Sequence, residues 1–446
     1  MRQESFGALL FNPLLSEELK LSQEEASITG LCDGSHSIGG MADEICRRYG
    51  VDPETAGQRV DDTLDKLSGL MAISWSGTVT SRRPAILRAT RAGERPYLST
   101  PKEINWDVTH ACNLRCPHCL TASGRRREDE LSTAEALGII DMLADAKVFY
   151  LLITGGEPFL RPDIFRLLGR LSETNMHVEV VTNAVSLDRK AIEKLPSYRV
   201  ANYQVSIDGI GDRHDAFRGK KGAFKAACRN ITRMADNGIV VNISMAITRE
   251  NLDQVNSVID LAVDLGCGAF IGSPVVPVGR GLANCDRLTL DKDGYLQFYK
   301  TLHERAGQLK GMLNISTEKC FQFLFERPLP GVGDDGRIGD DGRMGCAAGN
   351  DMLGIGADGT VYPCSFLRDF PLGNLRDTTL IEIWDGAPIL GSLRALKKKN
   401  MNGPCATCKY APEQCQGGCR ARAFYGSRDL RARDPACFLP IKNIKP

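Results

Sequence analysis

The sequence predicts an α/β fold: a partial parallel (β/α)6 barrel, preceded by a winged-helix-like domain and followed by a cysteine-rich domain. Across residues 104–310, six apolar runs alternate with amphipathic helix patterns, which is typical of parallel strands joined by helices. Residues 1–85 instead group three short helix patterns, and residues 311–446 hold most of the clustered cysteines. We therefore expect three domains, with a basic linker at 86–103 between the first and the second.

Composition sets limits on location and partners. The 446 residues fit two or three domains, and 42% hydrophobic with 25% charged residues is typical of a packed globular protein. The formal net charge of +1 gives no argument for a nucleic-acid or membrane-surface partner. There is no run of roughly 20 apolar residues and no secretory signal pattern. We expect a cytoplasmic protein, in which the 16 cysteines are better explained as metal ligands than as disulfides.

The first domain is expected to contain three helices and two flanking strands. Ser22 and Glu25 form a capping-box pattern at the start of the first helix, and Gly50 is suited to ending the second. Pro53 is suited to the first position of the third helix. The expected strands cover residues 6–11 and 71–75, and the expected helices cover residues 22–32, 38–49 and 53–70.

This arrangement is typical of winged-helix modules, many of which bind DNA. Arg47 and Arg48 are the only adjacent basic pair on these helices, so the charge pattern for phosphate contact is weak. The layout resembles the leader-peptide recognition element of peptide-modifying enzymes, which is similar to the small chaperone of pyrroloquinoline-quinone biosynthesis. That resemblance implies that an extended leader peptide adds a strand to the sheet edge. A packing domain without a ligand is the alternative.

The central segment is expected to alternate strands with helices. The strands cover residues 104–109, 149–154, 177–182, 203–207, 240–247 and 269–272. The helices cover residues 133–146, 164–174, 188–195, 224–238 and 252–265. Because chemistry in β/α barrels is found at the carboxyl ends of the strands, functional residues are expected in the loops that follow them.

The first of these loops contains three cysteines, Cys112, Cys116 and Cys119, with the spacing C-x3-C-x2-C. Such a loop can turn three thiolates towards one [4Fe–4S] cluster, which normally takes four. Since no fourth cysteine is nearby, the pattern favours a cluster with one iron left open for a substrate or cofactor. A zinc site and unrelated buried cysteines are the alternatives, although zinc sites usually pair two cysteine knuckles.

A second motif, Thr154-Gly-Gly-Glu-Pro158, falls at the end of the second expected barrel strand. Gly155 and Gly156 allow the backbone to approach a ligand closely, and Glu157 can accept a hydrogen bond from an ammonium group. With the cysteine loop, this motif resembles the radical S-adenosylmethionine (SAM) superfamily. The resemblance implies that the three cysteines hold the cluster and that SAM chelates the open iron. It also implies that Gly155–Glu157 contact the methionyl amine and that a 5′-deoxyadenosyl radical takes a hydrogen atom from the substrate.

Later strand ends carry polar residues to which the same resemblance assigns roles. Ser206 and Asp208 would lie near the ribose of SAM, and Arg218 would pair with its carboxylate. A strand-ending turn and a surface salt bridge are the alternatives. His118 stands where the family usually has an aromatic residue. His110 is either a structural hydrogen-bonding residue or a proton carrier.

Seven cysteines form a second array in the C-terminal segment. Seven thiolates are more than one cluster uses and nearly enough for two. The array resembles the SPASM extension, which carries two auxiliary [4Fe–4S] clusters, although six residues and not five separate Cys408 from Cys415. The interleaved pairing of that family assigns the first auxiliary cluster to Cys346, Cys364 and Cys419. It assigns the second to Cys405, Cys408, Cys415 and Cys437.

The first auxiliary cluster would then be one ligand short. Cys320 can supply that ligand, or the fourth iron is open to substrate. Zinc binding is the alternative for the cysteines from Cys405 to Cys419.

We expect a radical SAM/SPASM enzyme that modifies a ribosomally made precursor peptide, whose leader binds residues 1–85. Oxidative crosslinking or decarboxylation would follow hydrogen abstraction, with an electron donor such as flavodoxin or ferredoxin. Residues 112–123, 131–133 and 148–150 and the SPASM region most resemble the mycofactocin-type maturases, which decarboxylate and crosslink a peptide's C-terminal Val-Tyr. One alternative is the processing of haem or haem d1 side chains. Another is a cluster-carrying electron-transfer or DNA-binding protein.

Overall fold

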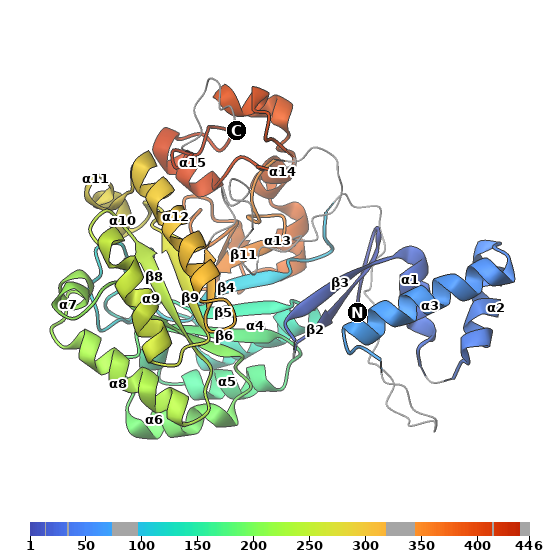
Figure 1. Ribbon diagram of the computed structural model, residues 1–446, viewed down its shortest axis with the longest axis horizontal. Helices are drawn as coiled ribbons and strands as arrows, with labels where there is room; N and C mark the ends of the chain where they lie inside the picture. The colour runs from blue at the N-terminus through green and yellow to red at the C-terminus, as the bar shows by residue number, and fades with distance from the viewer. Residues whose placement is uncertain (14, 34, 74–96, 318–343, 413, 438–446) are drawn as a thin grey trace. The chain divides into compact units, whose positions relative to one another are not determined.

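The computed structural model describes residues 1–13, 15–33, 35–73, 97–317, 344–412 and 414–437 (Figure 1). These residues fall into two compact units. Unit 1 is formed by Met1–Ser99, and unit 2 by the described residues from Thr100 onwards. In the described part of the chain, no helix is both long and apolar enough to cross a membrane.

Unit 1 contains a three-stranded antiparallel sheet in the order β1-β2-β3 and three helices. Ile28, Ile45 and Val60, one from each helix, are buried together in its core. The elements are β1 Arg2–Glu4, β2 Gly7–Asn12, β3 Glu17–Ser22, α1 Gln23–Leu31, α2 Ile38–Tyr49 and α3 Pro53–Gly69.

The three predicted helices are confirmed, and their caps have the predicted chemistry. The Ser22 side chain accepts from the backbone of Glu25, whose carboxylate accepts in return from Ser22, and Gly50 ends α2 with a left-handed φ of 68°. β1 and β3 were not predicted, because β3 (EELKLS) has only two apolar residues. The strand predicted at 71–75 is absent at Met71–Ile73, and its last two residues lie outside the described part.

Unit 2 contains a ten-stranded sheet in the order β10-β9-β8-β7-β6-β5-β4-β11-β12-β13. The strands from β10 to β11 in this order are all parallel, whereas β12 and β13 are antiparallel to their neighbours. The strands are β4 Glu103–Asp107, β5 Tyr150–Thr154, β6 His177–Thr182, β7 Asn202–Ser206, β8 Val241–Ile247, β9 Ala269–Pro274, β10 Asn314–Thr317, β11 Met352–Ile355, β12 Thr360–Tyr362 and β13 Gly373–Asn374.

The six predicted barrel strands, β4 to β9, are confirmed. The C-terminal segment continues the same sheet, since β11 pairs with β4, and this was not predicted because β10 to β13 have only two to four residues each. The helices are α4 Thr133–Asp145, α5 Ile164–Ser172, α6 Arg189–Lys194, α7 Asp212–Arg218, α8 Ala223–Asp236, α9 Val255–Asp264, α10 Arg280–Ala283, α11 Cys285–Leu288, α12 Lys292–Gln308, α13 Leu380–Gly386, α14 Pro388–Arg394 and α15 Arg420–Ser427. Helices α8 and α9 flank β8 and β9 (Figure 1).

Alternation along β4 separates a helix-packed face of the sheet from an inner face. Ile104 and Trp106 are fully buried, so Asn105 and Asp107 point to the opposite face. Gly354 is the partner of both Asn105 and Tyr362, which places Tyr362 on this inner face as well. The inner face therefore receives polar side chains from the barrel and from the C-terminal segment.

Candidate functional site

The three-cysteine loop follows β4, and the structure brings its thiols together. Cys112, Cys116 and Cys119 pack around Leu114 and Ala223, and Cys116 is 7% exposed. The Cys112 amide donates to the carbonyl of Gly124 at 2.8 Å, which closes the loop. Burial raises the pKa of the Cys112 thiol to about 11, and the neighbouring thiols of Cys116 and Cys119 add to this. Thiols in such surroundings become thiolates readily only when a metal takes up their charge.

A second loop, between β9 and α10, fastens the cysteine loop. The Arg280 guanidinium donates to the carbonyls of Cys116 at 2.9 Å and Ser123 at 2.7 Å. Gly279 has a left-handed φ of 59°, and a Cβ there would lie 2.1 Å from the carbonyl oxygen of Leu120. The sequence alone indicated no role for this loop, because its contacts are made across about 160 residues.

The glycines of the Gly-Gly-Glu-Pro motif approach the protein's own backbone. A Cβ on Gly155 would lie 2.6 Å from the carbonyl oxygen of Thr109, and a Cβ on Gly156 would lie 2.2 Å from that of Ala111. The amides of Gly156 and Glu157 donate to these two carbonyls at 2.7 Å each. The motif thereby joins the end of β5 to the start of the cysteine loop.

The carboxylate of Glu157 is buried and accepts three hydrogen bonds. They come from the Thr182 hydroxyl at 2.7 Å, the Asn183 amide at 2.7 Å and the Phe159 amide at 3.2 Å. Burial raises the pKa of Glu157, although these donors oppose the rise. Two carboxylate oxygens offer about four acceptor positions, so one further donor can still be accepted.

Asp208 and Arg218 form a buried ion pair beside the cysteine loop, with Oδ2 and Nε 2.6 Å apart. Asp208 also accepts from the Ala246 amide at 2.9 Å, and Nη1 of Arg218 lies 3.7 Å from Cys116 Sγ. Burial alone would raise the pKa of Asp208, but the charge of Arg218, together with His118, His214 and the Ala246 amide, lowers it. The residue predicted to contact the ribose, Asp208, and the residue predicted to contact the carboxylate, Arg218, therefore pair with one another beside the three-cysteine loop.

His118 lies beside the same ion pair. Its ring stacks on Phe217 with a centroid distance of 4.9 Å, and its Nε2 lies 4.0 Å from Asp208 Oδ2. Its Nδ1 is buried and has no hydrogen-bond partner among the residues that the structure describes. Burial lowers the pKa of His118 to about 4, so the ring is neutral near pH 7 and can pack as an aromatic residue would.

Two other predicted residues lie nearby. Ser206 is the last residue of β7 and is half-buried. The backbone amide of His110 donates to Glu130 at 2.7 Å, and burial lowers the pKa of the His110 ring.

These residues fit a cluster with an open iron and an amino-acid ligand. The three thiols pack in one cluster, and the Arg218 guanidinium, paired with Asp208, lies beside Cys116. The Nδ1 atom of His118 has no hydrogen-bond partner in the part of the chain that the structure describes. Among the described residues, no group of three or more His, Cys, Asp or Glu side chains converges on a single metal ion. A cluster does not require such convergence, because its ligands are spread over several irons.

The cysteines of the C-terminal segment gather into two groups, which we call the first and second auxiliary groups. In the first, burial raises the pKa of Cys364, and the thiols of Cys346 and Cys419 add to the rise. This group is packed among apolar side chains that include Leu367 and Leu393. Cys320, the further ligand considered for it, lies outside the described residues.

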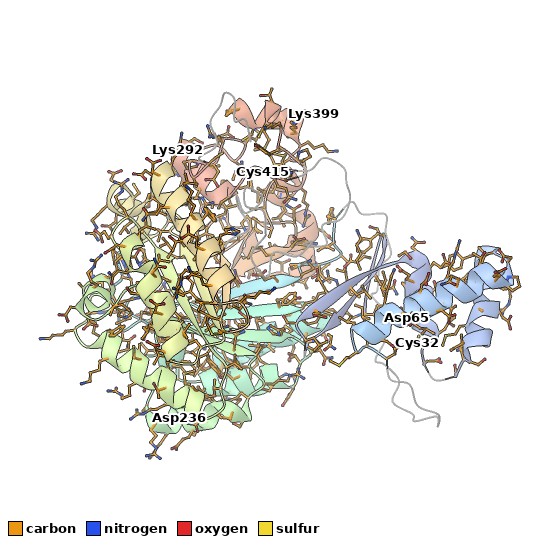
Figure 2. All side chains as sticks on the ribbon, viewed as in Figure 1. Cys32, Asp65, Asp236, Lys292, Lys399 and Cys415 are labelled. Atoms are coloured by element: carbon orange, nitrogen blue, oxygen red, sulfur yellow. The ribbon has the colours of Figure 1, made fainter. Side chains whose placement is uncertain are left out.

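In the second auxiliary group, the thiols of Cys405, Cys408 and Cys437 contribute to the raised pKa of Cys415, about 11, in which burial is the largest cause. Figure 2 shows Cys415 among the side chains of the C-terminal segment. These neighbours match the sets that the resemblance implies, although Cys405 and Cys408 also pack against the apolar cluster of the first group. The assignment of each set to a cluster remains a prediction.

A buried ion pair connects the two auxiliary groups. Asp434 pairs with Arg422 at 3.0 Å, and both side chains are 1% exposed. Asp434 also accepts from the Cys419 amide at 2.7 Å and the Ala436 amide at 2.9 Å. A Cβ on Gly418 would lie 2.5 Å from this carboxylate, so a larger residue would not fit. The sequence did not reveal this role, since neither residue belongs to a metal-ligand pattern.

A second ion pair joins the first auxiliary group to the barrel. Arg368, four residues after Cys364, pairs with Asp107 on the inner face of β4 and lies 5.3 Å from the ring of Tyr362. Its Nε donates to the carbonyl of Ser365 at 2.9 Å. The auxiliary segment thus reaches the same strand from which the three-cysteine loop begins.

Three family models match the chain. They are the Radical SAM superfamily at residues 106–262, an iron–sulfur cluster-binding domain (SPASM) at 346–409 and Coenzyme PQQ synthesis protein D (PqqD) at 26–71.

Similar proteins include both mycofactocin maturases and heme synthases. The mycofactocin maturase MftC of Mycolicibacterium smegmatis is 33% identical, over 76% of this chain and 83% of its own. The AdoMet-dependent heme synthase of Methanosarcina barkeri is 30% identical, over 76% of this chain and 97% of its own. Streptococcus suis SuiB bound to the precursor peptide SuiA has a similar structure, with a TM-score of 0.69, 18% identity and 96% coverage of both chains. At that identity, the structural similarity shows the fold alone.

Proposed function

Since this chain belongs to the radical SAM superfamily and carries a SPASM iron–sulfur domain, we propose that it modifies a ribosomally made precursor peptide. It is an enzyme that uses SAM and [4Fe–4S] clusters. The substrate and the bond that is made are the proposed part. Oxidative crosslinking or decarboxylation of the peptide is the reaction we favour.

The observation that carries the proposal is the presence of unit 1 in the same chain as the cluster-binding cysteines. Unit 1 matches the PqqD family, and within the described residues its strand β3 pairs only with β2. An edge strand offers free N–H and C=O groups to an extended peptide. SuiB, which shares the fold over nearly the whole chain, was solved with a precursor peptide.

At the radical site, Cys112, Cys116 and Cys119 would hold the cluster, and Gly155–Glu157 would receive the methionyl amine of SAM. Together, the reduced cluster and SAM supply a radical that abstracts hydrogen. Arg218 would receive the methionyl carboxylate, and Asp208 and Ser206 the ribose hydroxyls. Arg280 donates to two carbonyls of the cysteine loop, so it would hold the three cysteines in position to bind the cluster.

The auxiliary groups would hold two further clusters and accept an electron from the substrate, which makes the net reaction oxidative. Cys346, Cys364 and Cys419 would bind the first, whose remaining iron takes Cys320 or substrate. Cys405, Cys408, Cys415 and Cys437 would bind the second. A cytoplasmic location and an electron donor such as flavodoxin or ferredoxin complete the proposal.

The second candidate is a tetrapyrrole enzyme acting on haem or haem d1 side chains. The similarity to the M. barkeri heme synthase, over 97% of that protein, favours it. A tetrapyrrole substrate does not explain the presence of unit 1, whereas the match of unit 1 to the PqqD family favours a peptide substrate. We therefore rank it second.

The test is incubation of the reconstituted enzyme with SAM, a reductant and the peptide from a short open reading frame beside the gene. A mass change confined to the core of that peptide is expected, and Fe-coproporphyrin serves as the competing substrate. A variant lacking residues 1–85 should bind the peptide more weakly but still cleave SAM without coupling. If porphyrin is converted and the peptide is not, the second candidate is correct. If the truncated variant binds the peptide as tightly, unit 1 does not recognise it.

A further inference from the structure

The second auxiliary group lies beside an arginine that contacts one of its thiols. Nη2 of Arg433 is 3.3 Å from Cys437 Sγ and 2.9 Å from the Cys437 carbonyl oxygen. A guanidinium N–H at these distances donates to both atoms, and the acceptor sulfur belongs to a proposed cluster ligand.

The loop that carries Arg433 is fixed on both sides. Before it, the fully buried Arg420 donates to the carbonyls of Leu430 and Ala432 at 2.8 Å each. After it, the Cys437 amide donates to the carbonyl of Asp434 at 3.0 Å, and the Asp434 carboxylate is held by Arg422. These contacts fix the backbone on both sides of Arg433, and the two contacts to Cys437 place its guanidinium.

Two positive charges act on this group of cysteines. The guanidinium groups of Arg420 and Arg433 both interact electrostatically with the Cys405 thiol. Charge near the ligands and hydrogen bonds to the sulfurs are among the main determinants of iron–sulfur reduction potentials.

We propose that Arg433 raises the reduction potential of the cluster bound by Cys405, Cys408, Cys415 and Cys437. When that cluster gains one electron, no bond is made or broken and its negative charge increases by one. A fixed cation and an N–H donor on a ligand sulfur stabilise the more negative state. Arg433 thus acts by placing a positive charge beside a ligand sulfur. This charge makes the second cluster a better electron acceptor. The proposal rests on the ligand assignment proposed above.

A simpler role is also consistent with the contact to the Cys437 carbonyl, because Arg433 could merely close the loop. The two roles differ in what a change of charge does. A loop-closing role affects how much cluster is bound, whereas the proposed role affects the potential of a cluster that is still bound.

The test is a reductive titration of the reconstituted full-length protein, followed by electron paramagnetic resonance. Cys408→Ala identifies the signal of the second auxiliary cluster as the one that is lost. Arg433→Gln should shift the midpoint of this signal to a more negative potential, with iron content and the other signals unchanged. Arg433→Lys should shift it less, because the charge is kept. The matched control is Arg431→Gln, which removes the same charge from the same loop at an exposed residue paired with Asp429.

An unchanged midpoint in Arg433→Gln, an equal shift in Arg431→Gln, or loss of the cluster in Arg433→Gln would each overturn the proposal. If the unaltered protein shows no signal that depends on Cys408, the ligand assignment itself is wrong. The peptide-modification proposal is tested separately, since no substrate is present in this titration.

Discussion

The three-cysteine loop and the C-terminal cysteine segment present thiols by different means. The loop places three cysteines within eight residues and is fastened from outside by Arg280, which comes from the other end of the barrel sequence. The C-terminal segment spreads seven cysteines over residues 346–437 and is fastened from within by Arg422 and Asp434. The short spacing of the loop therefore indicates its candidate ligands but not the residue that holds them in place. In the C-terminal segment the cysteines are far apart in the sequence, so spacing alone does not indicate which of them lie together.

The largest effect is expected from loss of a cysteine in the three-cysteine loop, which should abolish SAM cleavage. Cys116→Ala removes the most buried ligand of the loop, and we expect it to abolish 5′-deoxyadenosine formation because SAM would lose its cluster. Chromatographic measurement of 5′-deoxyadenosine with SAM and reductant checks this. Cys285→Ala is the control, since this half-buried cysteine at the start of α11 belongs to none of the three cysteine groups. Undiminished 5′-deoxyadenosine formation in Cys116→Ala would refute the site.

The next largest effect is expected at the buried ion pair between Asp434 and Arg422. Asp434→Asn removes the negative charge from the buried pair with Arg422, and loss of one partner of a buried pair typically costs about 3–5 kcal/mol. Because Asp434 also holds the Cys419 amide, we expect both auxiliary clusters to be lost while 5′-deoxyadenosine is still formed. Iron analysis with spectroscopy of the auxiliary signals is the measurement. Asp429→Asn, in the same loop, should leave both clusters in place, and equal losses in the two variants would show that Asp434 has no special role.

Arg280→Met tests the external support of the three-cysteine loop. Two hydrogen bonds from a charged donor are removed, each typically worth about 1.5–3 kcal/mol. We expect weaker retention of the loop's cluster and a higher KM for SAM, with the auxiliary clusters unaffected. The control, Arg287→Gln, removes an exposed pair with Glu250 and should change neither quantity. Loss of auxiliary iron in Arg280→Met would mean that the two regions are not supported independently.

The smallest effect concerns an ion pair between the C-terminal segment and helix α4 of the barrel. Arg376, in the C-terminal segment, pairs with Glu135 on α4, and both side chains are about one-third exposed. We expect Glu135→Gln to lower the free energy of unfolding by less than about 1 kcal/mol, without loss of iron.

The pH dependence of this pair follows from its pKa. The hydrogen bond from Arg376 and those from Ser132 lower the pKa of Glu135 to about 2. Its contribution is therefore complete above the ordinary pKa of about 4.3 and is lost only as pH falls towards 2. Denaturant midpoints of the protein and of Glu135→Gln should differ equally at pH 8 and pH 6. A difference that grows between these values would contradict the assignment.

The sequence predicted the helices of unit 1 and the strands β4 to β9, because periodicity and capping residues are local signals. It did not predict β3, because the charged residues of this edge strand obscure the apolar pattern typical of a strand. It also did not predict the continuation of the barrel sheet by β11 to β13. Strands this short derive their pairing from the neighbouring strand and not from their own composition.

The candidate site shows the same division. Cys112–Cys119 and Gly155–Glu157 were predicted from spacing. Arg280, Asp434 and Arg433 were not, since they act through contacts between segments far apart in the sequence. The glycines of the Gly-Gly-Glu-Pro motif were expected to approach a ligand, and the structure shows them against the backbone of Thr109 and Ala111.

We propose that the chain holds one radical-site cluster and two auxiliary clusters in separate groups of cysteines. The most direct test is iron and sulfide analysis, with Mössbauer spectroscopy, of the anaerobically reconstituted protein and of a variant with Cys112, Cys116 and Cys119 changed to Ala. We expect about three [4Fe–4S] clusters in the first and about two in the second. A single cluster in the unaltered protein, or no loss of iron in the variant, would show that this assignment of three clusters is wrong.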